Sequence, residues 1–273
     1  MKNRTWLITG VSSGFGLEMT RQLLKKGNRV IGTVRNKEKV SDLMKEYPDT
    51  FTCEFLDVTD VPAIHELVNY SFEKFGTIDV IVSNAGYGLF AAAEELSDAE
   101  IDHIIATNLT GSIQLIKSAL PHMRKQGGGR IIQLSSYGGQ VAFPGNSMYH
   151  ATKWGIEGFC EAVAQEIKPF NIGITLIEPG GARTEFRYGS AKVAKLCWML
   201  QRGWLPATPS AWPPVSLKAQ IRNPRRCEWY SVLRRFKAPS PRWKPVLRIM
   251  KPRRSLRLPP TFRWVNKSKE NTK

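Results

Sequence analysis

Six short apolar segments alternate with segments of helical periodicity over the first 180 residues, and this alternation constrains the fold more than any other feature. The apolar segments are rich in Ile and Val and are bounded by Gly, Asp, Asn or Pro, as buried strands of a parallel sheet are. Such alternation predicts right-handed βαβ units and an α/β fold in which helices cover both faces of one doubly wound parallel sheet. The expected strands are Trp6–Thr9, Val30–Val34, Phe51–Leu56, Val80–Ser83, Ile131–Leu134 and Ile172–Ile177.

Two of the intervening segments show the helical period clearly. In Gly14–Gly27 the leucines share one face and the basic residues point elsewhere, and in Ser97–Gln126 Ile and Leu recur at steps of three and four. Ser97 is followed three residues later by Glu100, which is the pattern of a capping box. We therefore expect the second of these helices to begin at Ser97.

The net charge of +17 is distributed very unevenly along the chain. Residues 1–190 contain 19 basic and 21 acidic side chains, whereas residues 191–273 contain 21 basic and 2 acidic ones. The same boundary separates 21 of the 22 glycines from 11 of the 17 prolines and 6 of the 8 tryptophans. This predicts a folded domain over residues 1–190 and a basic tail over residues 191–273 that is rich in Pro, Arg and Trp and is disordered or aberrant.

Several classes of protein are not expected from this sequence. No apolar run reaches about 18 residues, so no membrane-spanning helix is predicted. The start, Met1 to Gly10, reaches a loop glycine too early for the apolar core of a signal peptide. The four cysteines form no Cys-x-x-Cys pair and the four histidines do not cluster, so neither a disulfide framework nor a metal site is expected. We expect a soluble cytoplasmic protein with reduced thiols.

A glycine-rich turn directly follows the first expected strand and opens the first helix. Glycine lets the backbone turn sharply and approach a pyrophosphate, and the helix N-terminus offers amide donors and a favourable dipole. Three glycines alone are a weak signal, but this position is where a dinucleotide-binding fold has its phosphate turn. The cofactor-binding residues expected here are Gly10, Ser12, Ser13, Gly14, Phe15 and Gly16.

The end of the second strand indicates which nicotinamide cofactor is bound. An acidic side chain at this place binds the ribose hydroxyls of NAD and repels the 2′-phosphate of NADP. In this chain Val34 occupies the acidic position and Arg35 follows it, and a guanidinium can pair with a phosphate. We therefore expect NADP, with NAD as the alternative, although Arg35 could also be a solvated residue that opens a helix.

A candidate catalytic group combines Ser136, Tyr149 and Lys153. Tyr149 and Lys153 are four residues apart, so a helix places them on one face. A free phenol has a pKa near ~10, and a neighbouring ammonium, together with the positive ring of a nicotinamide, lowers that pKa toward a value useful for proton transfer. Ser136 lies thirteen residues upstream at the end of the fifth strand, where open α/β sheets place their ligands.

The glycine spacing Gly-x-x-x-Gly-x-Gly and the spacing of Ser, Tyr and Lys together resemble the short-chain dehydrogenase/reductase family over roughly residues 1–190. The resemblance extends to Asp57-Val58-Thr59 and to Ser83-Asn84-Ala85-Gly86, in which Ser83 replaces the family's first Asn. It implies a Rossmann-like fold and hydride transfer between NADP(H) and a carbonyl or secondary alcohol. The further cofactor-binding residues that it implies are Asp57 and Val58 at the adenine, Asn84, Ala85 and Gly86, and Pro179, Gly180 and Thr184 at the nicotinamide amide.

In this family Tyr149 would be the general acid in ketone reduction and the base in alcohol oxidation. Lys153 would lower the pKa of Tyr149 and bind the nicotinamide ribose, and Ser136 would donate a hydrogen bond to the substrate oxygen. Asn108 matches the family's helix asparagine, which holds a water in the proton relay. Its alternative interpretation is a buried asparagine whose side chain is satisfied by the backbone.

Two neighbours of these residues are not expected to be catalytic. Ser135 is an alternative to Ser136, but strand alternation turns it to the other face of the sheet. His150 follows Tyr149 directly, and adjacent helix positions face apart.

The tail departs from the family pattern, which continues with a substrate-covering helix, another helix and a seventh strand. From Leu196 onward there is no sustained helical period and no Val/Ile strand, and eleven prolines interrupt long elements. Three interpretations compete: an arm that binds nucleic acid, a segment that lies on anionic membrane, and out-of-frame translation of a gene whose normal frame would complete the enzyme. We favour the third interpretation. In it the chain lacks the seventh strand at the edge of the sheet and the helix that covers the substrate.

The expected partners are a small-molecule carbonyl or alcohol and, as a homo-oligomer, further copies of the chain, whereas nucleic acid and membrane are not expected. The alternative function is a catalytically impaired dinucleotide-binding protein with a basic, nucleic-acid-binding tail.

Overall fold

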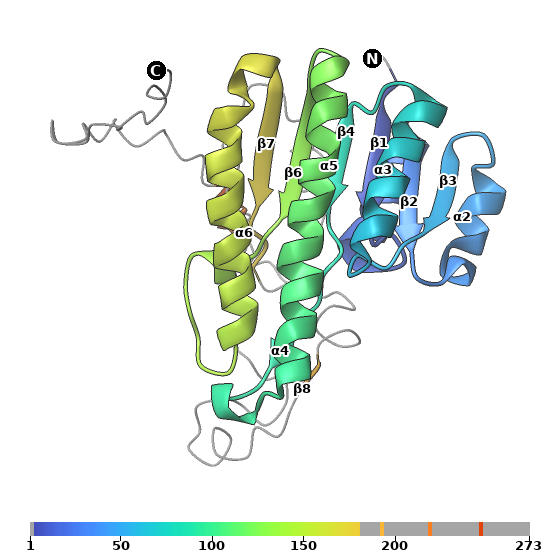
Figure 1. The fold of residues 1–273 in the computed structure, drawn as a ribbon. Coiled ribbons are helices and arrows are strands. Elements are labelled where there is room, and N and C mark those ends of the chain that lie inside the picture. The colour runs from blue at the N-terminus through green and yellow to red at the C-terminus, as the bar shows by residue number, and fades with distance from the viewer. Residues whose placement is uncertain (1–2, 181–191, 194–217, 220–245, 248–273) are drawn as a thin grey trace, which may run out of the picture.

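The computed structural model describes residues 3–180 and the pairs 192–193, 218–219 and 246–247. Within these residues the main sheet has six strands, all parallel, in the order β3-β2-β1-β4-β6-β7 (Figure 1). This is the order of a doubly wound dinucleotide-binding sheet, which confirms the predicted fold class. The strands are Thr5–Thr9 (β1), Arg29–Val34 (β2), Phe51–Phe55 (β3), Val80–Ser83 (β4), Gly129–Leu134 (β6) and Ile172–Ile177 (β7).

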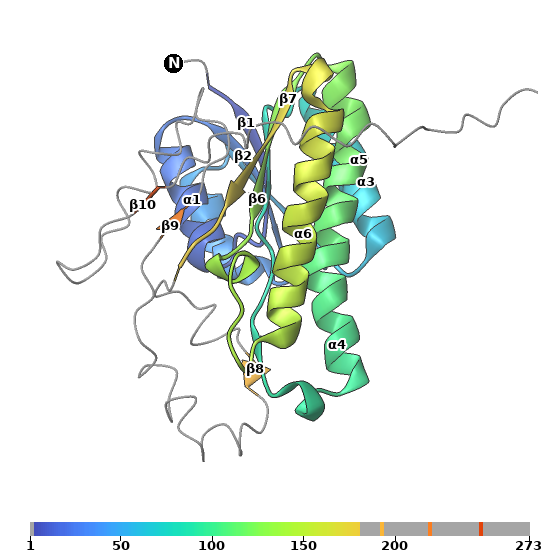
Figure 2. The ribbon, with the colours of Figure 1, turned by 90° about the vertical axis from the view of Figure 1, so that its left-hand side faces the viewer.

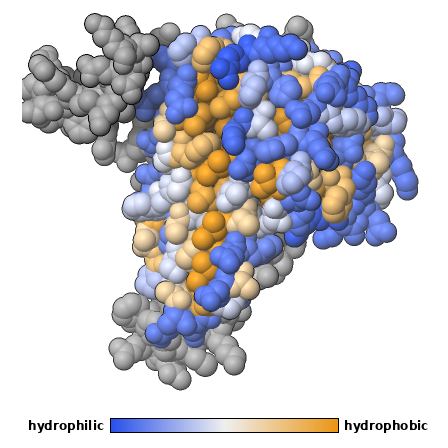
Figure 3. Space-filling view, viewed as in Figure 1, coloured by the Kyte–Doolittle hydropathy of each residue, from blue (hydrophilic) through white to orange (hydrophobic). Residues whose placement is uncertain are grey.

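Helices cover both faces of this sheet, as Figure 2 shows. Helix α1 lies on one face, and α3, α5 and α6 lie side by side on the other. A band of hydrophobic residues runs along the outer surface between α5 and α6 (Figure 3). The helices are Gly14–Lys25 (α1), Ser41–Glu46 (α2), Val61–Phe75 (α3), Asp98–Ile105 (α4), Gly111–Lys125 (α5) and Ser147–Glu166 (α6).

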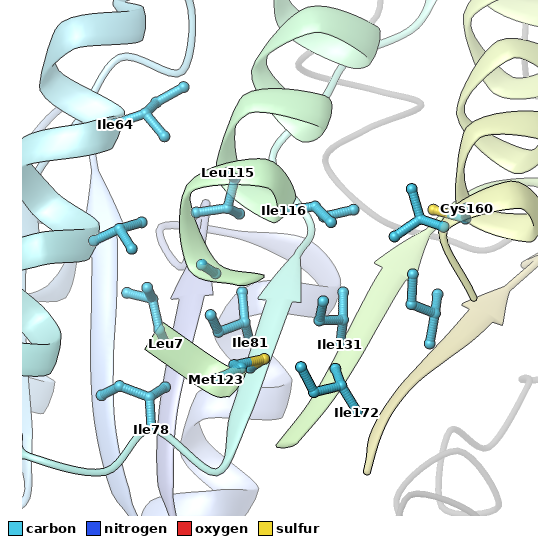
Figure 4. Close-up of a cluster of buried hydrophobic side chains, with 14 of the residues drawn as sticks. Leu7, Ile64, Ile78, Ile81, Leu115, Ile116, Met123, Ile131, Cys160 and Ile172 are labelled. Atoms are coloured by element: carbon cyan, nitrogen blue, oxygen red, sulfur yellow. The ribbon is translucent and has the colours of Figure 1, made fainter. Parts of the chain in front are cut away.

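Two hydrophobic clusters fill the space between the sheet and its helices, because successive strand residues point to opposite faces. Figure 4 shows the first cluster, in which strand residues meet Ile64 of α3, Ile116 of α5 and Cys160 of α6. The second lies under α1 and α2 and includes Leu23 and Leu43. The strand residues Leu7, Ile31, Ile81 and Ile131 belong to the first cluster, and Ile8, Val30, Val82 and Ile132 belong to the second.

The helix expected over Ser97–Gln126 is interrupted. Its start is confirmed, since the capping box between Ser97 and Glu100 is formed. However, a π-helical turn over Ala106–Thr110 separates α4 from α5. Here the chain packs closely against two loops: Asn108 bonds to the Tyr87 backbone, and the Gly111 position leaves no room for a Cβ. Such turns are frequent at functional sites.

Three two-residue strands are described beyond residue 180. β8 (Lys192–Val193) pairs in parallel with β5 (Leu89–Phe90), and β9 (Lys218–Ala219) pairs in parallel with β10 (Val246–Leu247). The prediction that no Val/Ile strand follows Leu196 concerns a part of the chain of which only these two pairs are described, so it stays a prediction. The three interpretations of the tail concern residues that lie outside the described ones. Among the helices described, none has the length and apolarity needed to cross a bilayer.

Candidate active site

The candidate site lies at the carboxyl ends of β1, β4 and β6, at the lower edge of the sheet in Figure 1. The glycine turn follows β1, Asn84 follows β4, and Ser136 follows β6 by two residues. The N-terminal turns of α6 bring Tyr149 and Lys153 to the same edge. Open α/β sheets bind their ligands at this edge, so the topology brings together residues from distant parts of the sequence.

The glycine turn is held in its shape by close packing and by Asn84. Gly10 has a φ of +73° and Gly14 a φ of +57°, values that residues other than glycine rarely adopt. A Cβ at Gly16 would overlap the carbonyl oxygen of Gly10 and lie 2.6 Å from Asn84 Nδ2. The Asn84 amide donates hydrogen bonds to the carbonyl oxygens of Thr9 (2.9 Å) and Gly10 (3.0 Å). Asn84 thus fastens the turn after β1 to the loop after β4.

The turn also fits a bound pyrophosphate. Ser12, Ser13 and Phe15 are all half-buried and surround the start of α1. Among the described contacts, the Ser13 side chain caps no amide of the first turn, and that turn carries no acidic residue. Backbone amides and the positive end of the helix dipole are therefore available to an anion.

Arg35 and Asp57 lie near each other at the ends of β2 and β3. Arg35 is exposed, whereas Val34 is buried in the cluster beneath α1 and cannot reach a ribose. Asp57 accepts hydrogen bonds from the backbone N–H (2.9 Å) and hydroxyl (2.8 Å) of Thr59. Partial burial raises the pKa of Asp57, but these bonds and the charges of Arg35 and His103 outweigh burial and lower it. The Asp57 side chain is therefore a carboxylate at neutral pH.

The segment after β4 connects the glycine turn to the candidate catalytic residues. The Ala85 N–H donates to Thr9 Oγ1 at 3.1 Å. A Cβ at Gly86 would lie 3.0 Å from Asn108 Oδ1 and 4.0 Å from Lys153 Nζ. A side chain at this position would therefore press on the Asn108 amide oxygen and come into contact with Lys153.

Asn108 lies in the π-helical turn and is 1% exposed. Its Nδ2 donates to the Tyr87 carbonyl at 2.8 Å, and its Oδ1 accepts from the Tyr87 N–H at 3.0 Å. Both polar atoms of the side chain thus bond to backbone, as the alternative interpretation of this residue expects. Val58 is half-buried, and its carbonyl oxygen occupies the place that a Cβ of Gly111 would need.

Ser136, Tyr149 and Lys153 come together in the structure. The Tyr149 hydroxyl is hydrogen-bonded to the Ser136 side chain, and Lys153 Nζ lies 5.7 Å from the centre of the Tyr149 ring. Ser136 Oγ also accepts from the Gly138 N–H at 3.0 Å. Lys153 Nζ donates to the Leu134 carbonyl at 3.0 Å, which anchors the ammonium beside the end of β6.

Burial dominates the electrostatics of this pair. It raises the pKa of Tyr149 to about 12, although the hydrogen bond with Ser136 opposes it. It lowers the pKa of Lys153 to about 8, although the charge of Glu157 opposes it. Among the chain's own groups the pKa of Tyr149 is therefore above its ordinary value, and its lowering by Lys153 together with the positive nicotinamide ring stays a prediction. Desolvation of the phenolate outweighs the effect of the Ser136 hydroxyl.

Ser135 and His150 are turned away from the Tyr149 hydroxyl. Ser135 Oγ donates to Glu157 Oε1 on α6. His150 contacts the backbone of Gly138 and Phe143. Strand alternation thus predicted the direction of Ser135, and the two hydrogen-bond partners of His150 are backbone groups of the loop after β6.

The segment after β7 lies beside the serine loop. The Pro179 carbonyl accepts from the Tyr137 N–H at 2.9 Å, and Gly180 is the last residue of the first described range. Thr184, the remaining candidate for the nicotinamide amide, lies outside the described residues. Within residues 3–180 and the three described pairs, no group of three or more His, Cys, Asp or Glu side chains could hold a metal ion.

Sequence reasoning missed Glu157, which is 4% exposed and lies between Ser135 and Gln140. An acidic residue one helical turn after Lys153, on the face that packs on the sheet, was the available signal. Taken alone, such spacing is equally typical of a solvated salt bridge.

Comparisons with known proteins agree with this geometry. The sequence model of the family described as short chain dehydrogenase matches residues 4–193. Oxidoreductase BOA17 of Botryotinia fuckeliana is 39% identical over 191 residues, which cover 70% of each protein. A crystal structure of a short-chain dehydrogenase from Streptomyces avermitilis has a TM-score of 0.69 at 35% identity and covers 77% of this chain and 80% of that one. A structure of ElxO with NADP bound has a TM-score of 0.64 at 31% identity, covering 75% and 80%.

Proposed function

The chain belongs to the short-chain dehydrogenase family of NAD(P)-dependent oxidoreductases, and on this basis we propose that it transfers a hydride between NADP(H) and a carbonyl or secondary alcohol. The observation that carries the proposal is the contact between Tyr149 and Ser136, with Lys153 beside the ring, at the sheet edge that holds the glycine turn. These groups combine a proton donor, a hydrogen-bond donor and a cation at one place.

Bound NADPH would supply the hydride, and the residues of the chain would supply the proton and the orientation. The glycine turn, Asp57 with Val58, and Asn84-Ala85-Gly86 would hold the dinucleotide. Lys153 would bind the nicotinamide ribose from its anchor on the Leu134 carbonyl. Ser136 would donate a hydrogen bond to the substrate oxygen as negative charge develops there.

Tyr149 would give its proton to the substrate oxygen in the reductive direction. A pKa of about 12 keeps the phenol protonated at neutral pH, so it is ready to act as an acid. Alcohol oxidation needs the phenolate instead, and the positive charges of Lys153 and of an oxidised nicotinamide would both favour it. The protonated phenol is the form that carbonyl reduction requires.

An assay with NADPH over a panel of ketones and aldehydes, and with NADP⁺ over secondary alcohols, tests the proposal. Cofactor consumption that requires both protein and substrate is expected. Tight cofactor binding without turnover of any substrate would contradict the proposal and favour a protein that only binds dinucleotides.

Preference for NADP is proposed from Arg35, and ElxO is a structural neighbour with NADP bound. Replacing Arg35 with Ala is expected to weaken NADPH binding about tenfold and leave NADH binding unchanged, because only NADPH carries the 2′-phosphate. Titration calorimetry of both cofactors measures this difference. Lys39→Ala removes a charge from another exposed residue nearby and serves as the control. An equal loss for both cofactors would contradict the assignment of Arg35 to the phosphate.

We further propose that residues 1–190 form the catalytic domain and that its partner is a small-molecule carbonyl or alcohol. Assembly into a homo-oligomer is part of the proposal, since oligomers are common in this family.

A further inference from the structure

One face of α6 carries two buried polar residues besides Tyr149 and Lys153. His150 is 7% exposed and Glu157 is 4% exposed. At about 100° per residue, all four side chains fall within an arc of roughly 100° around the helix. The proposed mechanism uses Tyr149 and Lys153 but gives His150 and Glu157 no task.

His150 makes two hydrogen bonds to the segment that follows β6. Its Nε2 accepts from the Phe143 N–H at 3.0 Å, and its Nδ1 lies 2.7 Å from the Gly138 carbonyl oxygen. A backbone N–H can only donate and a carbonyl can only accept, so the network assigns the hydrogen to Nδ1. The neutral imidazole therefore bridges two points of one loop, five residues apart.

Glu157 makes a second bridge to the same loop, two helical turns farther along α6. Its Oε1 accepts from the Ser135 hydroxyl, and its Oε2 accepts from Gln140 Nε2. The two bridges thus hold four residues of the loop to one helix.

Two glycines make this approach possible. A Cβ at Gly138 would lie 2.8 Å from His150 Nδ1, and a Cβ at Gly139 would overlap Glu157 Oε1 and lie 2.9 Å from Ser135 Oγ. The loop backbone therefore sits as close to each bridging side chain as a residue without a side chain allows.

We propose that His150 and Glu157 are positioning residues, which clamp the segment Ser135–Phe143 to α6 and so hold Ser136 against Tyr149. Ser136 lies within this segment, while Tyr149 belongs to α6, so the separation of the two hydroxyls depends on how the two elements are joined. The inference rests on the proposed function, because it assigns the clamp to catalysis. If Ser136 is displaced, it stabilises the transition state less, whereas the affinity for the cofactor changes little.

The catalytic test uses the full chain with Glu157→Gln. The new amide keeps the size of the side chain and one acceptor, but its NH₂ group faces a second donor, so one of the two bonds is lost. We expect kcat for ketone reduction to fall about tenfold or more, with the Kd for NADPH unchanged. Glu161→Gln makes the same change at an exposed position of α6 and should leave both quantities unchanged.

Exchanging the two partners tests whether the bridge, and not the identity of residue 157, is what matters. In the double variant Gln140→Glu with Glu157→Gln, the amide at position 157 can donate to the carboxylate at position 140 and still accept from Ser135. The carboxylate has moved from α6 to the loop, yet the bridge is restored. Recovery of kcat to within about threefold of wild type supports the clamp. A double variant no better than Glu157→Gln overturns it.

A second measurement does not depend on turnover. In His150→Leu the Phe143 N–H loses its acceptor, so hydrogen exchange at this amide should speed up at least about tenfold, whereas Glu161→Gln should not change it. Unaltered protection of Phe143 would overturn the clamp even in an active enzyme. If the wild-type chain reduces no carbonyl while this amide responds as expected, the proposed function fails and the loop-to-helix bridge stands.

Discussion

Replacing Tyr149 with Phe is expected to lower kcat for ketone reduction by about 100- to 10,000-fold, while NADPH binds as tightly as to wild type. The substitution removes one oxygen atom and keeps the ring, which is 8% exposed and packs with Leu89 and Ile104. The proton donor to the substrate oxygen disappears, and so does the hydrogen-bond partner of Ser136. Steady-state rates with the best ketone of the panel and calorimetric Kd values measure the two effects separately.

Tyr70→Phe is the matched control for this experiment. Tyr70 lies on α3 and is 38% exposed, so Tyr70→Phe removes the same hydroxyl group from a tyrosine outside the candidate site. The control should retain wild-type kcat. A Tyr149→Phe variant that reduces ketones at the wild-type rate would show that another group supplies the proton.

Replacing Gly16 with Ala is expected to weaken NADPH binding by more than about tenfold. The new methyl group would overlap the Gly10 carbonyl oxygen and press on the Asn84 amide, so either the turn or α1 must shift. The amides that face the pyrophosphate shift with it. Calorimetric titration with NADPH measures the loss, and a thermal unfolding curve shows whether the variant still folds.

Gly158→Ala is the control for Gly16→Ala. Gly158 also lies in a helix, and a Cβ there would meet nothing within 4 Å. It should bind NADPH as wild type does, with equal or slightly higher stability, because Ala favours a helix over Gly. A folded Gly16→Ala variant with wild-type affinity would mean that the dinucleotide does not contact this turn. Asn84→Ala offers a milder perturbation, since it removes two hydrogen bonds and adds no bulk.

The strands, and the meeting of Ser136, Tyr149 and Lys153 at one place, could be predicted because each has a signal within one short window of sequence. Buried parallel strands are continuous Ile and Val runs, so β4 and β7 are predicted with the observed bounds. The other main strands differ by only one or two residues at an end. Tyr149 and Lys153 share a helix face by spacing alone, and alternation along β6 separates Ser136 from Ser135.

Features that depend on contacts between distant segments could not be predicted in this way. The π-helical turn at Asn108 follows from close packing against Tyr87 and Val58, and no local periodicity reports such packing. The pKa of Tyr149 depends on burial under several elements at once. The two bridges from α6 to the loop after β6 can be recognised only in the folded structure, because nothing in the sequence distinguishes His150 and Glu157 from other polar helix residues.

The central claim is that this chain moves a hydride from NADPH to a carbonyl carbon while Tyr149 protonates the oxygen. Single-turnover reduction of a ketone with NADPH deuterated at the transferred position, followed by mass spectrometry of the alcohol, tests it most directly. One deuterium on the carbinol carbon in wild type, and almost none over the same time in Tyr149→Phe, is the predicted result. Alcohol without deuterium, or no alcohol from folded protein saturated with NADPH, would contradict the claim.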